Sequence, residues 1–201
     1  MALRVVSKTL IVVVLDESGS MSPKLTDTLG GFNQFMTSQR QVPNDQGYVY
    51  LVTFNSTVKV LYKGVPLDDI PALTGDNYKP SGYTALYDAI GRGVGVALED
   101  KGAEDRVICV IMTDGEENAS KHTTLAQVRE VIAECEGKGD WTFVYIGENP
   151  EQWSRSTGMS HGSSTRYNHH NSEDNYSSAN SAVTRLRTSV QKSIKNIFLP
   201  D

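Results

Sequence analysis

The chain has 201 residues, enough for one domain that buries most of the surface its unfolded form exposes. Its composition, 38% hydrophobic and 21% charged, is typical of a soluble globular protein, and its formal net charge of −5 argues against nucleic acid or an anionic membrane as the main partner. No apolar run approaches the length of a transmembrane span.

The N-terminal residues superficially resemble a secretory signal, because basic residues precede an apolar run. That run, residues 10–15, is too short for the hydrophobic region of a signal and ends at an acid. Two cysteines do not make a disulfide framework, and Cys109 lies in an apolar run, where a buried, reduced thiol is expected. These features favour a cytoplasmic protein.

The sequence of the first half of the chain predicts a strand, a helix and a hairpin. Residues 9–15 (TLIVVVL) are apolar on both faces, as is typical of a central parallel strand. Ser22 and Pro23 form a helix start signal, and apolar residues follow at helical spacing. Residues 48–54 predict a second strand. Three polar residues separate it from residues 58–62, so we expect a hairpin with an antiparallel strand at the edge of the sheet.

The second half continues the alternation of helices and strands. A helix with apolar residues four apart follows residues 81–84, and the apolar strand 107–113 ends at Asp114. Thr123 or Thr124 is expected to cap the next helix. The remaining elements are a strand at 141–146, a short helix from Asn149-Pro150, a polar loop at 160–178 with a short edge strand near 165–167, and a closing helix at 179–197.

This order of elements predicts one α/β domain spanning residues 1–201 with a core at about 9–159. We expect a Rossmann-like, three-layer sandwich with a mostly parallel central sheet, one antiparallel edge strand and helices on both faces. Ligands of such sheets bind beyond the carboxyl ends of the strands. Asp16 and Asp114 both lie at such ends.

Asp16, Ser18 and Ser20 alternate along the first loop, so their side chains can converge on one point. Carboxylate and hydroxyl oxygens are hard donors that suit Mg²⁺, Mn²⁺ or Ca²⁺ and suit Zn²⁺ poorly. Thr84 places another hydroxyl at a junction between loop and helix. Together with Asp114, these residues predict a site for a divalent cation.

Each of these residues also has a purely structural interpretation. Ser20, Ser22 or Thr84 can cap a helix, and Asp114 can simply occupy a turn. We assign Ser22 to a cap and the others to the metal, because an acid after seven apolar residues is costly to bury unless it is paired. Four further acids at this edge are expected to be solvated or to support the ligands: Glu17, Asp88, Glu116 and Glu117. The histidines at 161, 169 and 170 match no zinc spacing and are expected in a solvent-exposed loop.

DESGS, GYTALYDAI and TDGEEN, in this order and on these elements, resemble the von Willebrand factor A domain and its metal-ion-dependent adhesion site. The resemblance covers residues 9–146, and WTFVYIGEN and the final helix look most like small intracellular bacterial or bacteriophage members. It implies five metal ligands: Asp16, Ser18, Ser20, Thr84 and Asp114. In the family the hydroxyls bind the metal directly, the aspartates often act through water, and a carboxylate of a partner protein fills a remaining position.

The resemblance therefore implies a non-enzymatic protein-binding module that uses Mg²⁺ or Mn²⁺, with Ca²⁺ as a further option, to grip an Asp or Glu of a protein partner. An alternative is a metal-dependent phosphohydrolase that uses the same aspartates. Against it, Ser18 stands where an aspartyl-phosphate enzyme needs a second acid, and His122, the nearest candidate base, has no identifiable orienting partner. A third interpretation is a metal-free protein that keeps only the fold.

Overall fold

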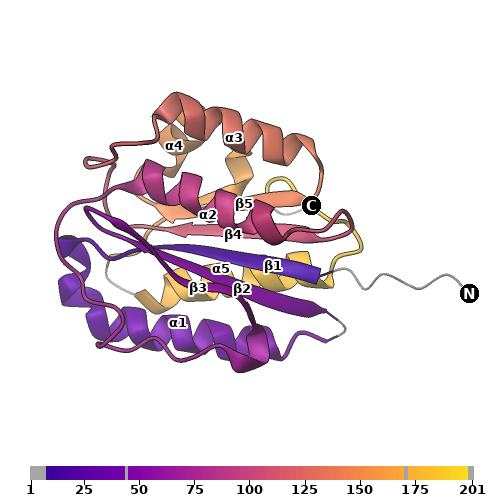
Figure 1. Ribbon diagram of the computed structural model, residues 1–201, viewed down its shortest axis with the longest axis horizontal. Coiled ribbons are helices and arrows are strands. Elements are labelled where there is room, and N and C mark those ends of the chain that lie inside the picture. Colours follow the sequence, from indigo (N-terminus) through magenta and orange to yellow (C-terminus); the bar gives the residue numbers. More distant parts are fainter. Residues whose placement is uncertain (1–7, 44, 170–171, 199–201) are drawn as a thin grey trace, which may run out of the picture.

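A six-stranded sheet forms the centre of the computed structural model, which describes residues 8–43, 45–169 and 172–198 (Figure 1). The strands lie in the order β3-β2-β1-β4-β5-β6, and all neighbours are parallel except the β2–β3 hairpin at one edge. This confirms the predicted mixed α/β sheet. The strands are β1 (Lys8–Asp16), β2 (Gln46–Phe54), β3 (Val58–Pro66), β4 (Arg106–Met112), β5 (Trp141–Gly147) and β6 (Ser164–Arg166).

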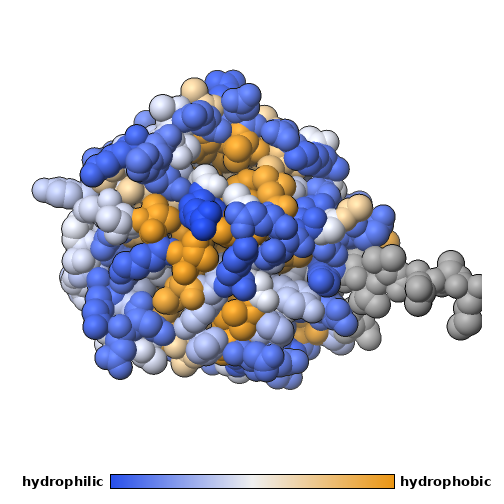
Figure 2. All heavy atoms as spheres, viewed as in Figure 1, coloured by the Kyte–Doolittle hydropathy of each residue, from blue (hydrophilic) through white to orange (hydrophobic). Residues whose placement is uncertain are grey.

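Helices cover both faces of the sheet, as expected (Figure 1). On one face lie α1 (Leu25–Arg40) and α5 (Ser172–Thr188), and on the other lie α2 (Leu86–Asp100), α3 (Leu125–Gly137) and α4 (Pro150–Thr157). Figure 2 shows the side of α2, where hydrophilic side chains cover most of the surface and apolar ones show through near the centre. No helix within the described ranges is long and apolar enough to cross a membrane.

The central strand β1 is buried from Thr9 to its end at Asp16, because it pairs with β2 on one side and β4 on the other. Its side chains alternate between the two cores. Ile11 and Val13 pack toward α1 and α5, whereas Val12 and Val14 pack toward α2. This two-sided burial explains the uninterrupted apolar run that identified the strand.

The α1–α5 contact depends on a glycine. A Cβ atom at Gly31 of α1 would lie 2.1 Å from Cδ2 of Tyr176 on α5, so only glycine leaves room for the ring there. Tyr176 is buried in the core shared by α1, α5 and the sheet. This packing lets α5 begin earlier than its polar sequence suggests.

The closing helix was predicted at 179–197, and the structure instead places α5 at Ser172–Thr188. The prediction of a polar loop that runs to residue 178 is therefore wrong at its end, whereas the short edge strand expected near 165–167 is present as β6. Glu173 and Asp174 lie in the first turn of α5, where acids favour the helix dipole. A stretch of serines and asparagines with low helix propensity thus becomes helical through its charges and its packing.

The end of α5 is fixed by a long-range contact from the sheet. The Arg106 guanidinium donates from Nη1 to the carbonyl oxygens of Leu186 at 2.6 Å and Ser189 at 3.2 Å. These bonds satisfy carbonyls that a helix end leaves unpaired. Beyond the helix, Val190 is fully exposed, whereas Ile197 is buried although it lies outside any helix.

Candidate metal-ion site

Three loops meet at the carboxyl edge of the sheet, and they carry all five predicted ligands. Asp16 ends β1 and Asp114 follows β4, and these two strands are parallel neighbours, so both carboxylates emerge side by side. Ser18 and Ser20 lie in the loop after β1, and Thr84 lies just before α2. Asp16, Ser18, Thr84 and Asp114 are buried, whereas Ser20 is exposed.

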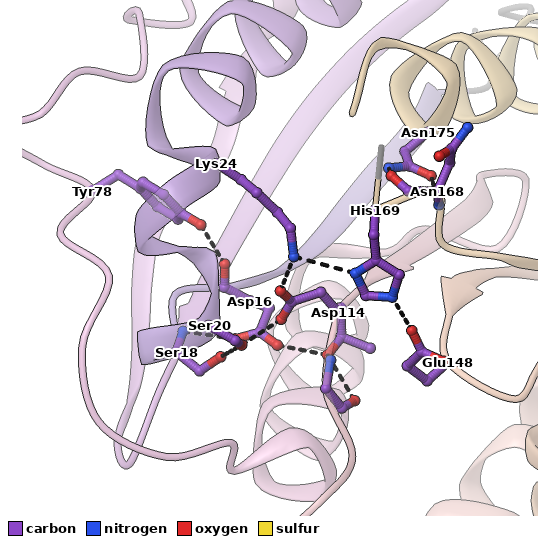
Figure 3. Close-up of polar contacts among 12 residues, drawn as sticks. Asp16, Ser18, Ser20, Lys24, Tyr78, Asp114, Glu148, Asn168, His169 and Asn175 are labelled. Atoms are coloured by element: carbon purple, nitrogen blue, oxygen red, sulfur yellow. Dashed lines mark hydrogen bonds and ion pairs between the residues drawn. The ribbon is translucent and has the colours of Figure 1, made fainter. Parts of the chain in front are cut away.

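Direct contacts link four of these residues (Figure 3). The Oδ1 atom of Asp16 accepts a hydrogen bond of 2.7 Å from the backbone N–H of Ser18. The Ser18 and Ser20 hydroxyl oxygens lie 3.0 Å apart, and the Ser20 hydroxyl donates to Oδ1 of Asp114 at 2.5 Å. The three oxygen-bearing side chains of the first loop therefore converge, together with Asp114, as their alternate spacing predicted.

Thr84 joins the same cluster. A Cβ atom built at Gly115 would lie 3.4 Å from Thr84 Oγ1 and 4.0 Å from Ser20 Oγ, so both hydroxyls border the same small space. The alternative role of Thr84 as a helix cap does not hold, because the N-cap residue of α2 is Ala85, and the first-turn N–H groups of Tyr87 and Asp88 donate to the side chains of Glu117 and Ser120.

The predicted Ser22 cap is wrong. Ser22 lies inside a short 3-10 helix, Gly19–Lys24, and its hydroxyl lies 3.4 Å from the carbonyl oxygen of Pro80, to which it donates. The N-cap residue of α1 is Lys24, without a side-chain cap. The extra 3-10 turn between the first loop and α1 displaces the serine from the helix start.

Buried side chains fix the backbone of the first loop. The Tyr78 hydroxyl donates to the carbonyl oxygen of Asp16 at 2.5 Å. Glu17, which we expected near solvent or behind the ligands, is almost fully buried, and its Oε1 accepts from the backbone N–H of Lys79 at 2.5 Å. Because Tyr78 and Lys79 belong to the second loop, these bonds hold the first two loops together.

The turn before Thr84 requires a glycine. Gly82 has φ +73°, which disfavours any residue with a side chain, and its carbonyl oxygen accepts from the N–H of Gly19 at 3.1 Å. Asn118, in the loop after β4, then accepts from the N–H of Thr84 at 2.8 Å and donates its own N–H back to Thr84 at 3.0 Å. All three loops are thus tied to one another through the backbone.

Asp88, one turn into α2, supports the loop before α3 rather than facing open solvent. Its carboxylate accepts backbone N–H groups of Lys121, His122 and Thr123 at 2.6 to 3.0 Å. Burial opposes ionisation, but these hydrogen bonds outweigh it and lower the pKa of Asp88. Asp88 therefore supports the backbone of this loop.

Within the described part of the chain, the groups that donate to the buried Asp16 carboxylate, the Ser18 N–H and the Thr113 hydroxyl, are neutral. Burial raises the pKa of Asp16 above its ordinary value of 3.8 and the nearby Asp114 adds to the rise, while hydrogen bonds from Thr113 and Ser18 oppose it. The Thr113 hydroxyl donates to Oδ2 of Asp16 at 2.6 Å. A cation at the cluster would stabilise the ionised form.

Comparison with known proteins identifies the family of this chain. The sequence profile of the von Willebrand factor type A domain matches residues 11–184. The chain belongs to the von Willebrand factor type A domain family. A search of curated proteins finds no match.

Several solved structures share the fold of this chain at low sequence identity. The PilB minor pilin from Streptococcus sanguinis is 13% identical with a TM-score of 0.64, covering 93% of this chain and 64% of its own. The proximal thread matrix protein 1 of the mussel byssus, with a zinc-occupied MIDAS motif, is 17% identical with a TM-score of 0.60, covering 90% and 46%. Manganese-loaded TRAP protein of Plasmodium vivax is 16% identical with a TM-score of 0.57, covering 85% and 71%. This chain thus spans less than two thirds of the first two proteins.

The donor set of this von Willebrand factor A domain fits a hard divalent cation. Among the described residues, no three His, Cys, Asp or Glu side chains gather as they do in a zinc site or an all-carboxylate site. The cluster instead offers two carboxylates and three hydroxyls, which are oxygen ligands of the kind that Mg²⁺ and Mn²⁺ prefer.

The side chain of Lys24 shows that this cluster attracts positive charge. Its ammonium group forms an ion pair with Oδ2 of Asp114, a carboxylate whose side chain is 1% exposed (Figure 3). The same Nζ atom lies 5.3 Å from the centre of the Tyr167 ring, and the Lys24 side chain is 15% exposed. A cation that binds the carboxylates must therefore share Asp114 with Lys24 or displace it.

The contacts continue from Lys24 to the far side of the site. Lys24 Nζ lies 3.4 Å from Nδ1 of His169, and Nε2 of His169 contacts Oε1 of Glu148, which follows β5. Asn168 and Asn175 hold this histidine's loop against α5 through bonds of 2.7 and 3.0 Å. His169 is exposed, as expected, yet it borders the site.

Sequence reasoning missed Lys24, Tyr78, Glu148 and the position of His169. No local pattern marks these residues, because each reaches the site through the tertiary path of a separate loop. His170 lies outside the described residues, and so does the side chain of His161.

Proposed function

We propose that this von Willebrand factor A domain is a divalent-cation-dependent protein-binding module. Asp16, Ser18, Ser20, Thr84 and Asp114 would hold Mg²⁺ or Mn²⁺, and the ion would bind an Asp or Glu carboxylate of a partner protein. The convergence of two carboxylates and three hydroxyls from three loops is the observation that carries this proposal.

The chemistry of the ligands supports a binding role. Three neutral hydroxyls and two carboxylates leave much of the charge of a divalent cation uncompensated, so an incoming anionic oxygen gains strongly. The ion then acts as a bridge between proteins. We propose no catalytic role for the chain, because the groups of the described residues that donate to the Asp16 carboxylate are the Ser18 N–H and the Thr113 hydroxyl, neither of which is a general base.

The cellular setting is part of the proposal. Cys109 and Cys135 are both buried free thiols, which agrees with a reducing compartment. We place the protein in the cytoplasm and, on its sequence resemblance, among the small intracellular bacterial or bacteriophage members of the family.

A capture experiment with a matched pair of variants tests the function. Immobilised protein is incubated with host lysate in Mg²⁺ or in EDTA, and bound proteins are identified by mass spectrometry. We expect the partners to disappear in EDTA and with Ser20→Ala, which removes a proposed ligand. They should remain with Ser22→Ala, which changes the same residue type two positions away. Partners that persist in EDTA and with Ser20→Ala would contradict the proposal.

A further inference from the structure

A hollow of about 220 Å³ lies directly beside the metal-site cluster. It is bordered by the start of α2, the loop after β4, the end of β5 and α4. Gly115 belongs to both places, since it lines the hollow, follows Asp114 directly and approaches the Thr84 hydroxyl. A ligand held by the metal therefore has this hollow within reach.

Aromatic rings form the wall of the hollow. The Tyr145 and Trp153 rings are stacked, with centroids 4.6 Å apart and an interplanar angle of 9°, and Tyr87 lies 6.3 Å from Trp153. Trp153 is 9% exposed, and its buried Nε1 atom has no hydrogen-bond partner among the described residues. Faces of tyrosine and tryptophan rings attract cations, and Tyr87 is the least buried of the three rings.

Carboxylates give the hollow a negative rim. Glu116 is exposed, accepts a hydrogen bond of 3.0 Å from Asn149, and forms no ion pair with a lysine or arginine of the described chain. The Oε1 atom of Glu148 contacts the ring of His169. Burial raises the pKa of Tyr145, and the Glu148 and Glu116 carboxylates raise it further, as expected where negative charge surrounds a phenol. Glu117, in contrast, is used by the backbone N–H groups of Tyr87 and Ser120.

We propose that this hollow binds an arginine side chain from the same partner segment whose carboxylate reaches the metal. A planar guanidinium can stack on the partly exposed ring of Tyr87 while it donates hydrogen bonds to Glu116 and Glu148, a combination that lysine matches less well. An extended segment advances about 3.3–3.6 Å per residue, so an arginine within three residues of the acid lies at most about 11 Å from it. Such a short reach suits two places that share Gly115. The partner role of the hollow rests on the proposed function, but its affinity for a guanidinium does not.

The hollow is tested first without metal. N-acetyl-arginine amide is titrated in EDTA while the two tryptophan indole N–H signals, of Trp141 and Trp153, are followed by NMR. We expect a saturable shift of the Trp153 signal and none of the buried Trp141 signal. N-acetyl-citrulline amide, which has the same shape without the charge, should bind about tenfold more weakly.

A pair of double variants tests the acidic rim. Glu116→Gln with Glu148→Gln should weaken arginine amide binding about tenfold. Glu130→Gln with Glu151→Gln makes the same charge change at two exposed positions outside the hollow and should leave binding unchanged. No saturable shift in the wild type, equal binding of citrulline, or equal losses in both double variants would overturn the proposal.

Short peptides then test whether one ligand occupies the hollow and the metal site together. Each carries one Asp and one Arg in either order, separated by up to two glycines, and is compared with its citrulline counterpart in Mg²⁺ and in EDTA. We expect one spacing to bind about tenfold more tightly than its counterpart in Mg²⁺. If arginine amide binds but no peptide gains affinity from Mg²⁺, the proposed function fails while the hollow stands. If Mg²⁺ strengthens the peptides and arginine adds nothing at any spacing, the hollow's partner role fails.

Discussion

The two carboxylates of the metal site lie in unequal surroundings. Asp16 is wholly buried, accepts bonds from Ser18 and Thr113, and has its backbone held by Tyr78. Asp114 instead faces the partly exposed Lys24, which supplies a positive charge from within the chain. The Asp16 half is therefore rigid and short of positive charge, whereas the Asp114 half has a counter-ion that can move away.

This difference indicates how the site admits a cation. The rigid half fixes where a metal can bind, because its loops are tied to one another through the backbone. The other half adjusts, since a metal must compete with the Lys24 ammonium for Asp114. Removing the Asp16 charge should therefore raise the stability of the metal-free protein, whereas removing the Asp114 charge should lower it. Removing the Lys24 charge should raise the affinity for metal.

Asp16→Asn should have the largest effect on metal binding, a loss of about 100-fold or more in affinity for Mn²⁺ by isothermal titration. The metal-free variant should nevertheless be more stable than the wild type at pH 7, by about 1 kcal/mol in urea unfolding, because a buried charge is removed. Asp114→Asn should also lose metal affinity but should lower stability, because it leaves Lys24 unpaired. Equal stability changes in the two variants would contradict the contrast.

The same contrast predicts a pH dependence. The pKa of Asp16 is raised in the folded state, so its protonated form favours folding below the ordinary pKa of 3.8, and this contribution is lost as the pH rises through the raised pKa. Urea unfolding of the metal-free wild type should show this fall in stability, and Asp16→Asn should lack it. A difference between the two proteins that does not vary with pH would refute this account of Asp16.

Lys24→Met should raise Mn²⁺ affinity about tenfold, or about 1.4 kcal/mol, because the variant keeps the stem of the side chain and removes a competing charge. Lys121→Met, at an exposed lysine that pairs with no acid of the described chain, is the control. Unchanged or weaker metal binding by Lys24→Met would mean that the ammonium does not compete for Asp114.

Tyr78→Phe should have the smallest effect, a decrease of about 1 kcal/mol in the free energy of unfolding, because it removes one buried hydrogen bond to the Asp16 carbonyl. Tyr83→Phe removes a hydroxyl from a side chain that is 70% exposed and should change stability far less. Similar results for the two variants would show that Tyr78 does not hold the first loop.

Much of this fold is readable from the sequence because the parallel strands are buried on both faces. β1 and β4 appear as unbroken apolar runs, and the polar gap at 55–57 marks the β2–β3 hairpin. The limits of α5 were missed for a different reason. Its start depends on the fit of Tyr176 against Gly31 and its end on Arg106, and neither contact leaves a local pattern.

The site residues also divide into those that a local sequence pattern predicts and those that depend on tertiary contacts. Asp16, Ser18 and Ser20 lie close in sequence, and the strand ends that bring Asp114 beside them are predictable from the sheet. Lys24 has no such mark, since a lysine after a helix start signal is ordinarily a surface residue. Its pairing with Asp114 depends on how the 3-10 turn after Ser18 directs the chain.

Anomalous diffraction from crystals grown in millimolar MnCl₂ tests the central claim most directly. We predict one strong manganese peak among the side chains of Asp16, Ser18, Ser20, Thr84 and Asp114, with the Lys24 ammonium moved away from Asp114. A peak elsewhere, or no peak while Lys24 remains paired with Asp114, would contradict the account.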